Sequence, residues 1–228
     1  MTPGRNLRVV VLPSPLLGPA TYEPLAASLE SLGCSVTVAD LPVVPTTPQT
    51  VLAGFESVLA SGCDVVLAHS NAGYYLPALV ERRSVAVVAM DAALPTQDAC
   101  ETRLAPAQFA ELVHSLPLTG GRLPPWPDWW EHSEVRPLFP DEGWFERVRR
   151  EAPRLLPAYF TGRLPVPRAW ASGPRAYVAF GDTYADEVAF AETSGWLVRR
   201  FDGHHLAHLA APDEVAQLVR KVCDDLLG

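Results

Sequence analysis

The chain has 228 residues, of which 48% are hydrophobic and 19% are charged, and its formal net charge is -8. A chain of this length buries roughly 70% of its extended surface on folding, so we expect one globular domain that needs no disulfide or metal to hold it together. The acidic charge argues against a nucleic-acid partner, because neutralising phosphates requires clustered Lys and Arg.

No apolar run approaches the ~20 residues that span a bilayer, so no membrane partner is expected. The first residues lack the apolar core and cleavage site of a secretory leader, which predicts a cytoplasmic protein. The four cysteines are far apart and form no metal-binding spacing, so we expect reduced, buried thiols. The sequence does not distinguish a monomer from a homodimer.

Short β-branched runs alternate with amphipathic helical patterns along most of the chain. Strands are predicted at residues 7–12, 35–39, 64–68, 84–90, 175–180 and 196–201. Helices are predicted at residues 22–32, 49–61, 72–82, 186–193 and 213–227. Several strands are apolar on both faces, as in parallel sheets covered by helices on each side. The pattern therefore predicts an α/β fold with a mostly parallel sheet of about six strands.

Residues 94–167 interrupt this alternation. They contain helical patterns at 106–116 and 141–156, no strand pattern, and a stretch rich in proline and tryptophan. Connections in α/β folds are usually about 2–6 residues long, so we predict a helical cap inserted into a core formed by residues 1–93 and 168–228.

The aromatic residues of this insertion have two possible roles. They can fasten the cap to the sheet domain, or they can line an apolar substrate pocket. The candidates for substrate contact are Trp126, Trp129, Trp130 and Trp144.

The stretch DVVLAHSNAGYYLPAL, residues 64–79, leads from an apolar strand through Ser70 into a helix. Ala68 and Ala72 lie two positions on either side of Ser70. A serine on so sharp a turn needs small neighbours, because its backbone is strained and the flanking residues are crowded. The alternative is a serine that only caps a helix.

This arrangement resembles the nucleophile elbow of α/β-hydrolases, G-x-S-x-G, with alanine at both outer positions. The resemblance also covers the first strand and its loop, Asp40-Leu41-Pro42, the inserted cap and the C-terminal stretch FDGHHLAHLAAP. It implies the α/β-hydrolase fold, a nucleophilic Ser70, a histidine that takes its proton and an acid that orients the histidine.

Within the C-terminal stretch, the family's spacing back from Pro212 selects His205, whereas adjacency to Gly203 selects His204. We expect His205 to be the base and His208 to pack against or cap the following helix. The three histidines lack the further ligands of zinc motifs, so no metal is expected.

Three carboxylates compete for the role of the acid. Asp182 is our choice, because it lies nearest the end of the strand at 175–180. Asp186 would need a longer loop, and Tyr184 occupies the position where the family commonly has aspartate. Asp91 closes the strand after the elbow helix, from which some members of the family take their acid.

The resemblance also implies two hydrogen-bond donors for the oxyanion. One is the backbone N–H of Asn71, directly after the nucleophile. The other lies in the loop after the first strand, where Pro13 and Ser14 replace the usual His-Gly and Pro15 has no N–H to offer. The second donor is therefore Leu16 or the Ser14 group, and we choose Leu16.

The resemblance implies a serine hydrolase that cleaves a small apolar ester, thioester or lactone through an acyl-serine intermediate, without a cofactor. Two alternatives remain open at this stage. The same Ser70–His205 pair can support lyase, cyclase or acyl-transfer chemistry, or the protein can be a non-catalytic ligand-binding member of the fold.

Overall fold

The structure is a computed structural model that describes residues 6–41, 47–81, 83–95 and 99–228. Four features of the sequence predictions fall outside these ranges. They are the first five residues, Pro42 in the stretch after the second strand, the last residue of the helix predicted at 72–82, and residues 96–98 of the predicted cap.

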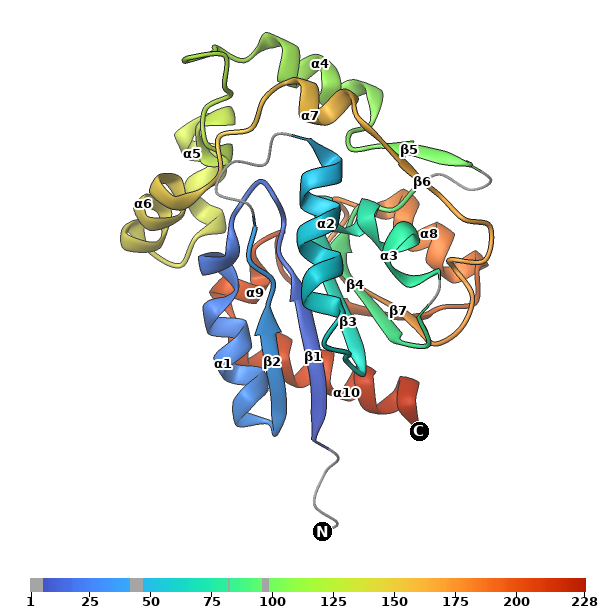
Figure 1. Ribbon diagram of the computed structural model, residues 1–228. Helices are drawn as coiled ribbons and strands as arrows, with labels where there is room; N and C mark the ends of the chain where they lie inside the picture. Colours follow the sequence, from blue (N-terminus) through green and yellow to red (C-terminus); the bar gives the residue numbers. More distant parts are fainter. Residues whose placement is uncertain (1–5, 42–46, 82, 96–98) are drawn as a thin grey trace.

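A six-stranded parallel sheet forms the centre of the molecule, in the order β2-β1-β3-β4-β7-β8 (Figure 1). Its strands are β1 (Leu7–Leu12), β2 (Cys34–Val38), β3 (Val65–Ser70), β4 (Ala86–Ala92), β7 (Arg175–Phe180) and β8 (Leu197–Phe201). The predicted fold class is therefore confirmed. Both β3 and β4 continue two residues beyond their predicted ends, and these extra residues reach the site described below.

Helices cover both faces of this sheet. They are α1 (Glu23–Ser31), α2 (Pro48–Leu59), α3 (Leu76–Val80), α8 (Ala185–Thr193) and α10 (Pro212–Leu227). Alternate residues of each strand point to opposite faces. Leu7, Val9 and Val11 of β1 join the cluster under α1 and α10, whereas Val10 and Leu12 join the cluster under α2, α3 and α8. Apolar side chains on both faces explain why the strands lack a polar side.

Two helix starts follow from local sequence. Pro212 begins α10, where its missing N–H costs nothing, and Asp213 and Glu214 in the first turn oppose the positive end of the helix dipole. Thr47 caps α2 by accepting a hydrogen bond from the Thr50 N–H.

The described residues of the predicted cap segment, 94–95 and 99–167, lie mainly beyond the carboxyl ends of the strands (Figure 1). It contains β5 (Glu101–Arg103), α4 (Ala107–Ser115), η3 (Trp126–Trp129), α5 (His132–Val135), η4 (Arg136–Leu138), α6 (Glu142–Glu151), α7 (Ala158–Thr161) and β6 (Arg163–Pro165). Its buried side chains, including Leu104, Phe145 and Tyr159, share one hydrophobic cluster with the sheet face under α2 and α3.

Two expectations for this segment were wrong. β5 and β6 pair as an antiparallel ribbon, although no strand was predicted there; three residues are too few to display an alternating pattern. Helix α6 ends at Glu151 rather than residue 156, because Ala152 precedes Pro153 and a residue before proline disfavours the helical conformation.

The cysteines form no disulfide. Cys34 and Cys223 are buried as expected, whereas Cys100 is exposed. Among the described residues, no helix combines the length and apolar character needed to cross a bilayer.

Candidate active site

Ser70 lies on a strained turn between β3 and a short 3-10 helix, η2 (Asn71–Tyr75). Its φ of 57° and ψ of -130° fall outside the regions that side-chain-bearing residues prefer, at a cost of about 1–3 kcal/mol. The neighbouring Ala68 and Ala72 are fully buried, and any Cβ atom on Gly73 would collide with the carbonyl oxygen of Ala93. Small residues therefore let the turn approach the end of β4, as expected from the sequence.

His205 lies beside this serine. Its Nε2 is 3.1 Å from Ser70 Oγ, and its Nδ1 is 2.7 Å from Asp91 Oδ2. Because a carboxylate only accepts hydrogen bonds, Nδ1 carries the proton, and Nε2 is left to accept from the serine hydroxyl. His205, rather than His204, thus occupies the position predicted for the base.

Asp91 occupies the position predicted for Asp182, which corrects the choice made from the sequence. Asp91 is fully buried, and its Oδ1 accepts a hydrogen bond of 2.9 Å from the Phe180 N–H at the end of β7. Asp182 and Asp186 are both exposed and belong to the turn after β7 and the start of α8.

A β-bulge explains why Asp91 points at His205. The register between β3 and β4 shifts after His69, so Ser70 pairs with Ala92, and Asp91 has a φ of 41°. The Tyr177 hydroxyl donates to the Ala92 carbonyl and accepts from the Ala92 N–H, which braces the bulge. Bulges redirect side chains in this way. The available signal in the sequence was one carboxylate inside an apolar strand, since a buried charge requires a partner.

The side chain of Asn71 ties the turn to the cap segment. Its Nδ2 donates to the Leu104 carbonyl at 2.7 Å, and its Oδ1 accepts from the Tyr159 hydroxyl at 2.9 Å. Tyr159 is held in turn by Tyr75, at 2.7 Å between the two hydroxyls. Asn71 is the first residue of η2, where backbone N–H groups have no partner within the helix. The predicted oxyanion donor is therefore fixed in place from two sides.

The second predicted donor, the Leu16 N–H, is engaged within its own loop. It donates to Ser14 Oγ at 3.3 Å, a long hydrogen bond. The Ser14 N–H donates to the Tyr22 hydroxyl at 2.8 Å. Leu16 can donate to a substrate oxygen only if the Ser14 hydroxyl releases it.

Tyr184 is a further neighbour of the serine that the sequence prediction missed. Its ring centroid lies 5.7 Å from that of His205, and the Ser70 side chain is one of the groups that influence the pKa of Tyr184, which places the hydroxyl near Ser70. Burial raises the pKa of Tyr184, so its O–H remains a hydrogen-bond donor at neutral pH. Tyr184, which stands at the aspartate position of the family's G-x-x-D pattern, thus brings a hydroxyl group rather than a carboxylate close to the site.

A cleft of about 400 Å³ opens beside His205. The apolar part of its lining comprises Trp126, Trp130, Val135, Leu138 and Phe180, and Asp182, Glu134 and His204 add polar groups. Ser70 itself is not part of this lining and is only 4% exposed, so the cleft reaches the site at His205.

The four tryptophans predicted for substrate contact separate into two pairs. Trp126 and Trp130 line the cleft, and the Trp126 ring centroid lies 6.3 Å from that of His205. Trp129 instead packs against Phe160, and its indole N–H donates to a backbone carbonyl. Trp144 lies under the Arg147 guanidinium and does not line this cleft. These two side chains stabilise the cap segment internally.

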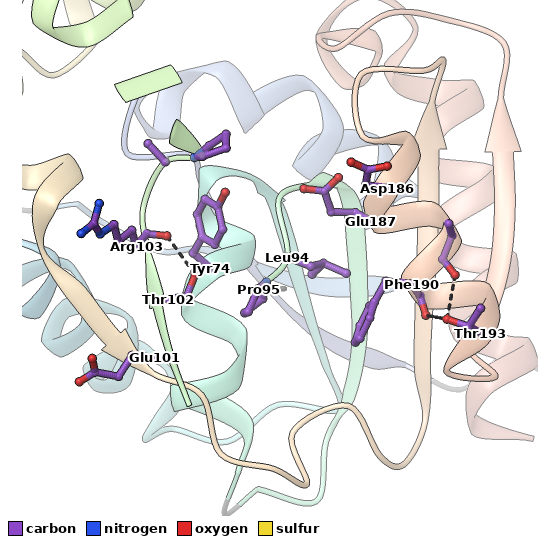
Figure 2. A pocket seen from close by; sticks show the side chains of 13 residues that line it. Tyr74, Leu94, Pro95, Glu101, Thr102, Arg103, Asp186, Glu187, Phe190 and Thr193 are labelled. Carbon is purple, nitrogen blue, oxygen red and sulfur yellow. Dashed lines mark hydrogen bonds between the residues drawn. The ribbon is translucent and has the colours of Figure 1, made fainter. Parts of the chain in front are cut away.

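A larger cavity, of about 590 Å³, lies between β5 and α8 (Figure 2). Tyr74, Leu94 and Phe190 supply apolar surface, and Asp186 and Glu187 lie at the start of α8. Burial raises the pKa of Glu187. Burial also raises the pKa of Tyr74 and of Tyr184, and the Glu187 charge adds to both shifts. Glu187 thus lies in the cavity lining and acts electrostatically on Tyr184, which is next to His205.

Comparison with known proteins gives matches in structure alone: no protein-family model and no curated protein matches the sequence. An extracellular α/β-hydrolase from a Paenibacillus species is 16% identical, with 95% of this chain and 98% of that chain covered and a TM-score of 0.72. Polyneuridine aldehyde esterase is 17% identical over 96% and 99% of the two chains, with a TM-score of 0.73.

Tomato methylketone synthase I, bound to 2-tridecanone, is 13% identical over 98% of this chain and 100% of that chain, with a TM-score of 0.72. Identities this low carry information about the fold alone. Together with the parallel sheet and the strained serine turn, they show that this chain has the α/β-hydrolase fold.

Proposed function

We propose that the protein is a serine hydrolase that cleaves a small apolar ester, thioester or lactone through an acyl-serine intermediate on Ser70. The observation that carries this proposal is the continuous contact from Ser70 Oγ through the His205 imidazole to the Asp91 carboxylate. An esterase is among the structural neighbours, so the same fold can carry this reaction.

In the proposed first step, Ser70 Oγ attacks the substrate carbonyl carbon while His205 Nε2 takes the hydroxyl proton. The Asp91 carboxylate stabilises the resulting imidazolium and keeps it oriented. The carbonyl oxygen becomes negatively charged and receives a hydrogen bond from the Asn71 N–H. Leu16, once released by Ser14, supplies a second donor.

The tetrahedral intermediate then collapses, and His205 returns the proton to the departing alcohol, thiol or ring oxygen. A water molecule attacks the acyl-serine by the same route and gives its proton to His205, which restores the Ser70 hydroxyl. The reaction consumes one water and needs no cofactor.

The cleft beside His205 supports a small, mainly apolar substrate. Its volume of about 400 Å³ is at the lower end of small-molecule pockets, and two of its walls are indole rings from the cap segment. We propose that residues 94–167 act as a cap that shapes this cleft.

The proposal is tested with a series of p-nitrophenyl esters from acetate to octanoate and with the matching acyl thioesters. The wild-type protein should release product with at least one of them, and Ser70→Ala should reduce turnover to the level of the buffer. Turnover that survives in Ser70→Ala would overturn the nucleophilic role.

A further inference from the structure

Three aromatic side chains lie packed behind His205 and have no role in the reaction described so far. His69, His208 and Tyr22 are all fully buried. The His69 ring stacks on His205, with centroids 4.7 Å apart and planes 27° apart. His208 packs against both of the others, 4.3 Å from the His69 centroid and 4.8 Å from that of Tyr22.

Hydrogen bonds connect this cluster to both sides of the active site. His69 Nε2 lies 3.0 Å from the backbone carbonyl oxygen of His205, and His69 Nδ1 lies 2.7 Å from the Tyr22 hydroxyl. The Tyr22 hydroxyl also accepts the hydrogen bond from the Ser14 N–H. One chain of hydrogen bonds thus runs from the loop at Ser14, after β1, to the backbone of His205.

The chemistry of the partners fixes the direction of every bond in this chain. A carbonyl oxygen only accepts, so His69 Nε2 carries a proton and donates to His205. Burial strongly lowers the pKa of His69, so the ring is neutral and its Nδ1 must accept. The Tyr22 hydroxyl therefore donates to Nδ1, which leaves its oxygen free to accept from Ser14.

We infer that His69 and Tyr22 are positioning residues, which hold the His205 backbone and the loop at Ser14 at a fixed separation across Ser70. The inference rests on the proposed function. His69 is the residue directly before Ser70. Through its hydrogen bond to the His205 carbonyl, its side chain fixes the distance between the His205 imidazole and the Ser70 hydroxyl.

Because the two rings are stacked, His69 must be uncharged while His205 is protonated. His205 gains a positive charge when it takes the serine proton, and a second charge on a ring 4.7 Å away would oppose this step. The neutral His69 ring avoids the repulsion and presents its π face to the imidazolium.

His208 provides the contrast within the same cluster. Its burial is equal to that of His69, yet neither ring nitrogen has a hydrogen-bond partner among the described residues. If hydrogen bonding positions His205, a change at His208 should leave turnover intact, whereas a change at His69 should not.

The test compares two amide substitutions at one position. Gln places its amide nitrogen close to the site of His Nε2, so His69→Gln retains the donor to the His205 carbonyl. Asn reaches only as far as Nδ1, so His69→Asn retains the contact with Tyr22 and loses the one with His205. Both remove the imidazole, and each keeps one end of the chain.

We expect His69→Asn to lower kcat about tenfold more than His69→Gln, with KM changed less than twofold in both, because loss of one buried hydrogen bond is worth about a factor of ten. His208→Met, the matched control, should keep kcat within twofold of wild type. Equal losses in the two amide variants, or an equal loss in His208→Met, would overturn the inference, because packing alone would then explain the effect.

Tyr22→Phe gives a second readout should the His69 variants fail to fold. It removes the donor to His69 and the acceptor for Ser14 but leaves the His69 bond to His205, so kcat should fall a few-fold, as in His69→Gln, and by less than in His69→Asn; an unchanged kcat would also overturn the inference. The labelling rate of Ser70 by a fluorophosphonate, measured in parallel, separates the two levels of the account. If the wild-type protein neither hydrolyses esters nor reacts with the fluorophosphonate, the proposed function and this inference are both overturned. If the wild type reacts and the variants have the same kcat and labelling rate as wild type, only the inference is overturned.

Discussion

The burial of His208 predicts how the free energy of unfolding changes with pH. Its imidazole is fully buried against Tyr22 and His69, with neither nitrogen hydrogen-bonded among the described residues. Burial, with a smaller contribution from His205, lowers the pKa of His208 to about 3, from 6.5 for an ordinary histidine. The substitution to test is His208→Met, which fills a similar volume with a flexible apolar side chain.

The sign follows from proton binding. Above pH 6.5, His208 is neutral in both the folded and the unfolded chain, so it adds no pH dependence. Between pH 6.5 and about 3, the unfolded chain binds a proton at this residue and the folded chain does not, so the folded state loses stability on acidification. At pH 5 the loss is the difference of 1.5 pH units multiplied by about 1.4 kcal/mol, or about 2 kcal/mol.

The assay is urea unfolding at pH 5, 6, 7 and 8 for wild type and His208→Met. The variant should be more stable than wild type by a margin that grows by about 2 kcal/mol between pH 7 and pH 5. The lowered pKa of His69 also makes the folded state less stable on acidification. His69 is present in both proteins, so its contribution cancels in the difference between their stabilities. Parallel stability curves across this range would refute the reasoning, because His208 would then titrate alike in both states.

Three further substitutions test separate parts of the site. Asp91→Asn should lower kcat about 10³- to 10⁴-fold by releasing the His205 tautomer, whereas Asp182→Asn should stay within about twofold; the reverse order would restore Asp182 as the acid. Tyr184→Phe removes the hydroxyl near Ser70 and should lower kcat/KM about tenfold in steady-state assays, and an unchanged value would exclude a role in turnover. Gly73→Ala should destabilise the fold by about 1–3 kcal/mol or more in urea unfolding, since the new Cβ meets a backbone carbonyl; wild-type stability would show that the elbow can move.

The sequence was sufficient to locate the serine turn and the histidine that lies beside Ser70. Small residues around Ser70 have a steric cause that acts locally, and the spacing back from Pro212 depends only on a short loop and a helix start. The six strands could be predicted for the same reason, because both faces of a covered sheet are apolar.

The acid could not be located in this way, because it depends on a β-bulge. A shift of one residue between β3 and β4 turns Asp91 toward His205, and nothing in the local pattern of β4 encodes the shift. The tryptophans show a related limit: Trp126 and Trp129 are three residues apart, yet one lines the cleft and the other packs inside the cap segment. Their roles depend on how η3 lies against distant residues such as Phe160.

The chain of hydrogen bonds behind His205 could not be predicted from the sequence either. It joins Ser14, Tyr22, His69 and His205, which come from four separate stretches, and it exists only once β1 and β3 lie side by side. Buried polar groups are satisfied by partners that the fold supplies, so their pairing is a property of the tertiary structure.

Covalent labelling of Ser70 shows whether this serine is a nucleophile. The protein is treated with a fluorophosphonate, and the modified peptide is located by mass spectrometry. We expect one adduct, on Ser70 of the folded protein, and its rate of formation should fall sharply in Asp91→Asn. A folded protein that remains unmodified at Ser70, or that labels as fast without Asp91, would contradict this expectation.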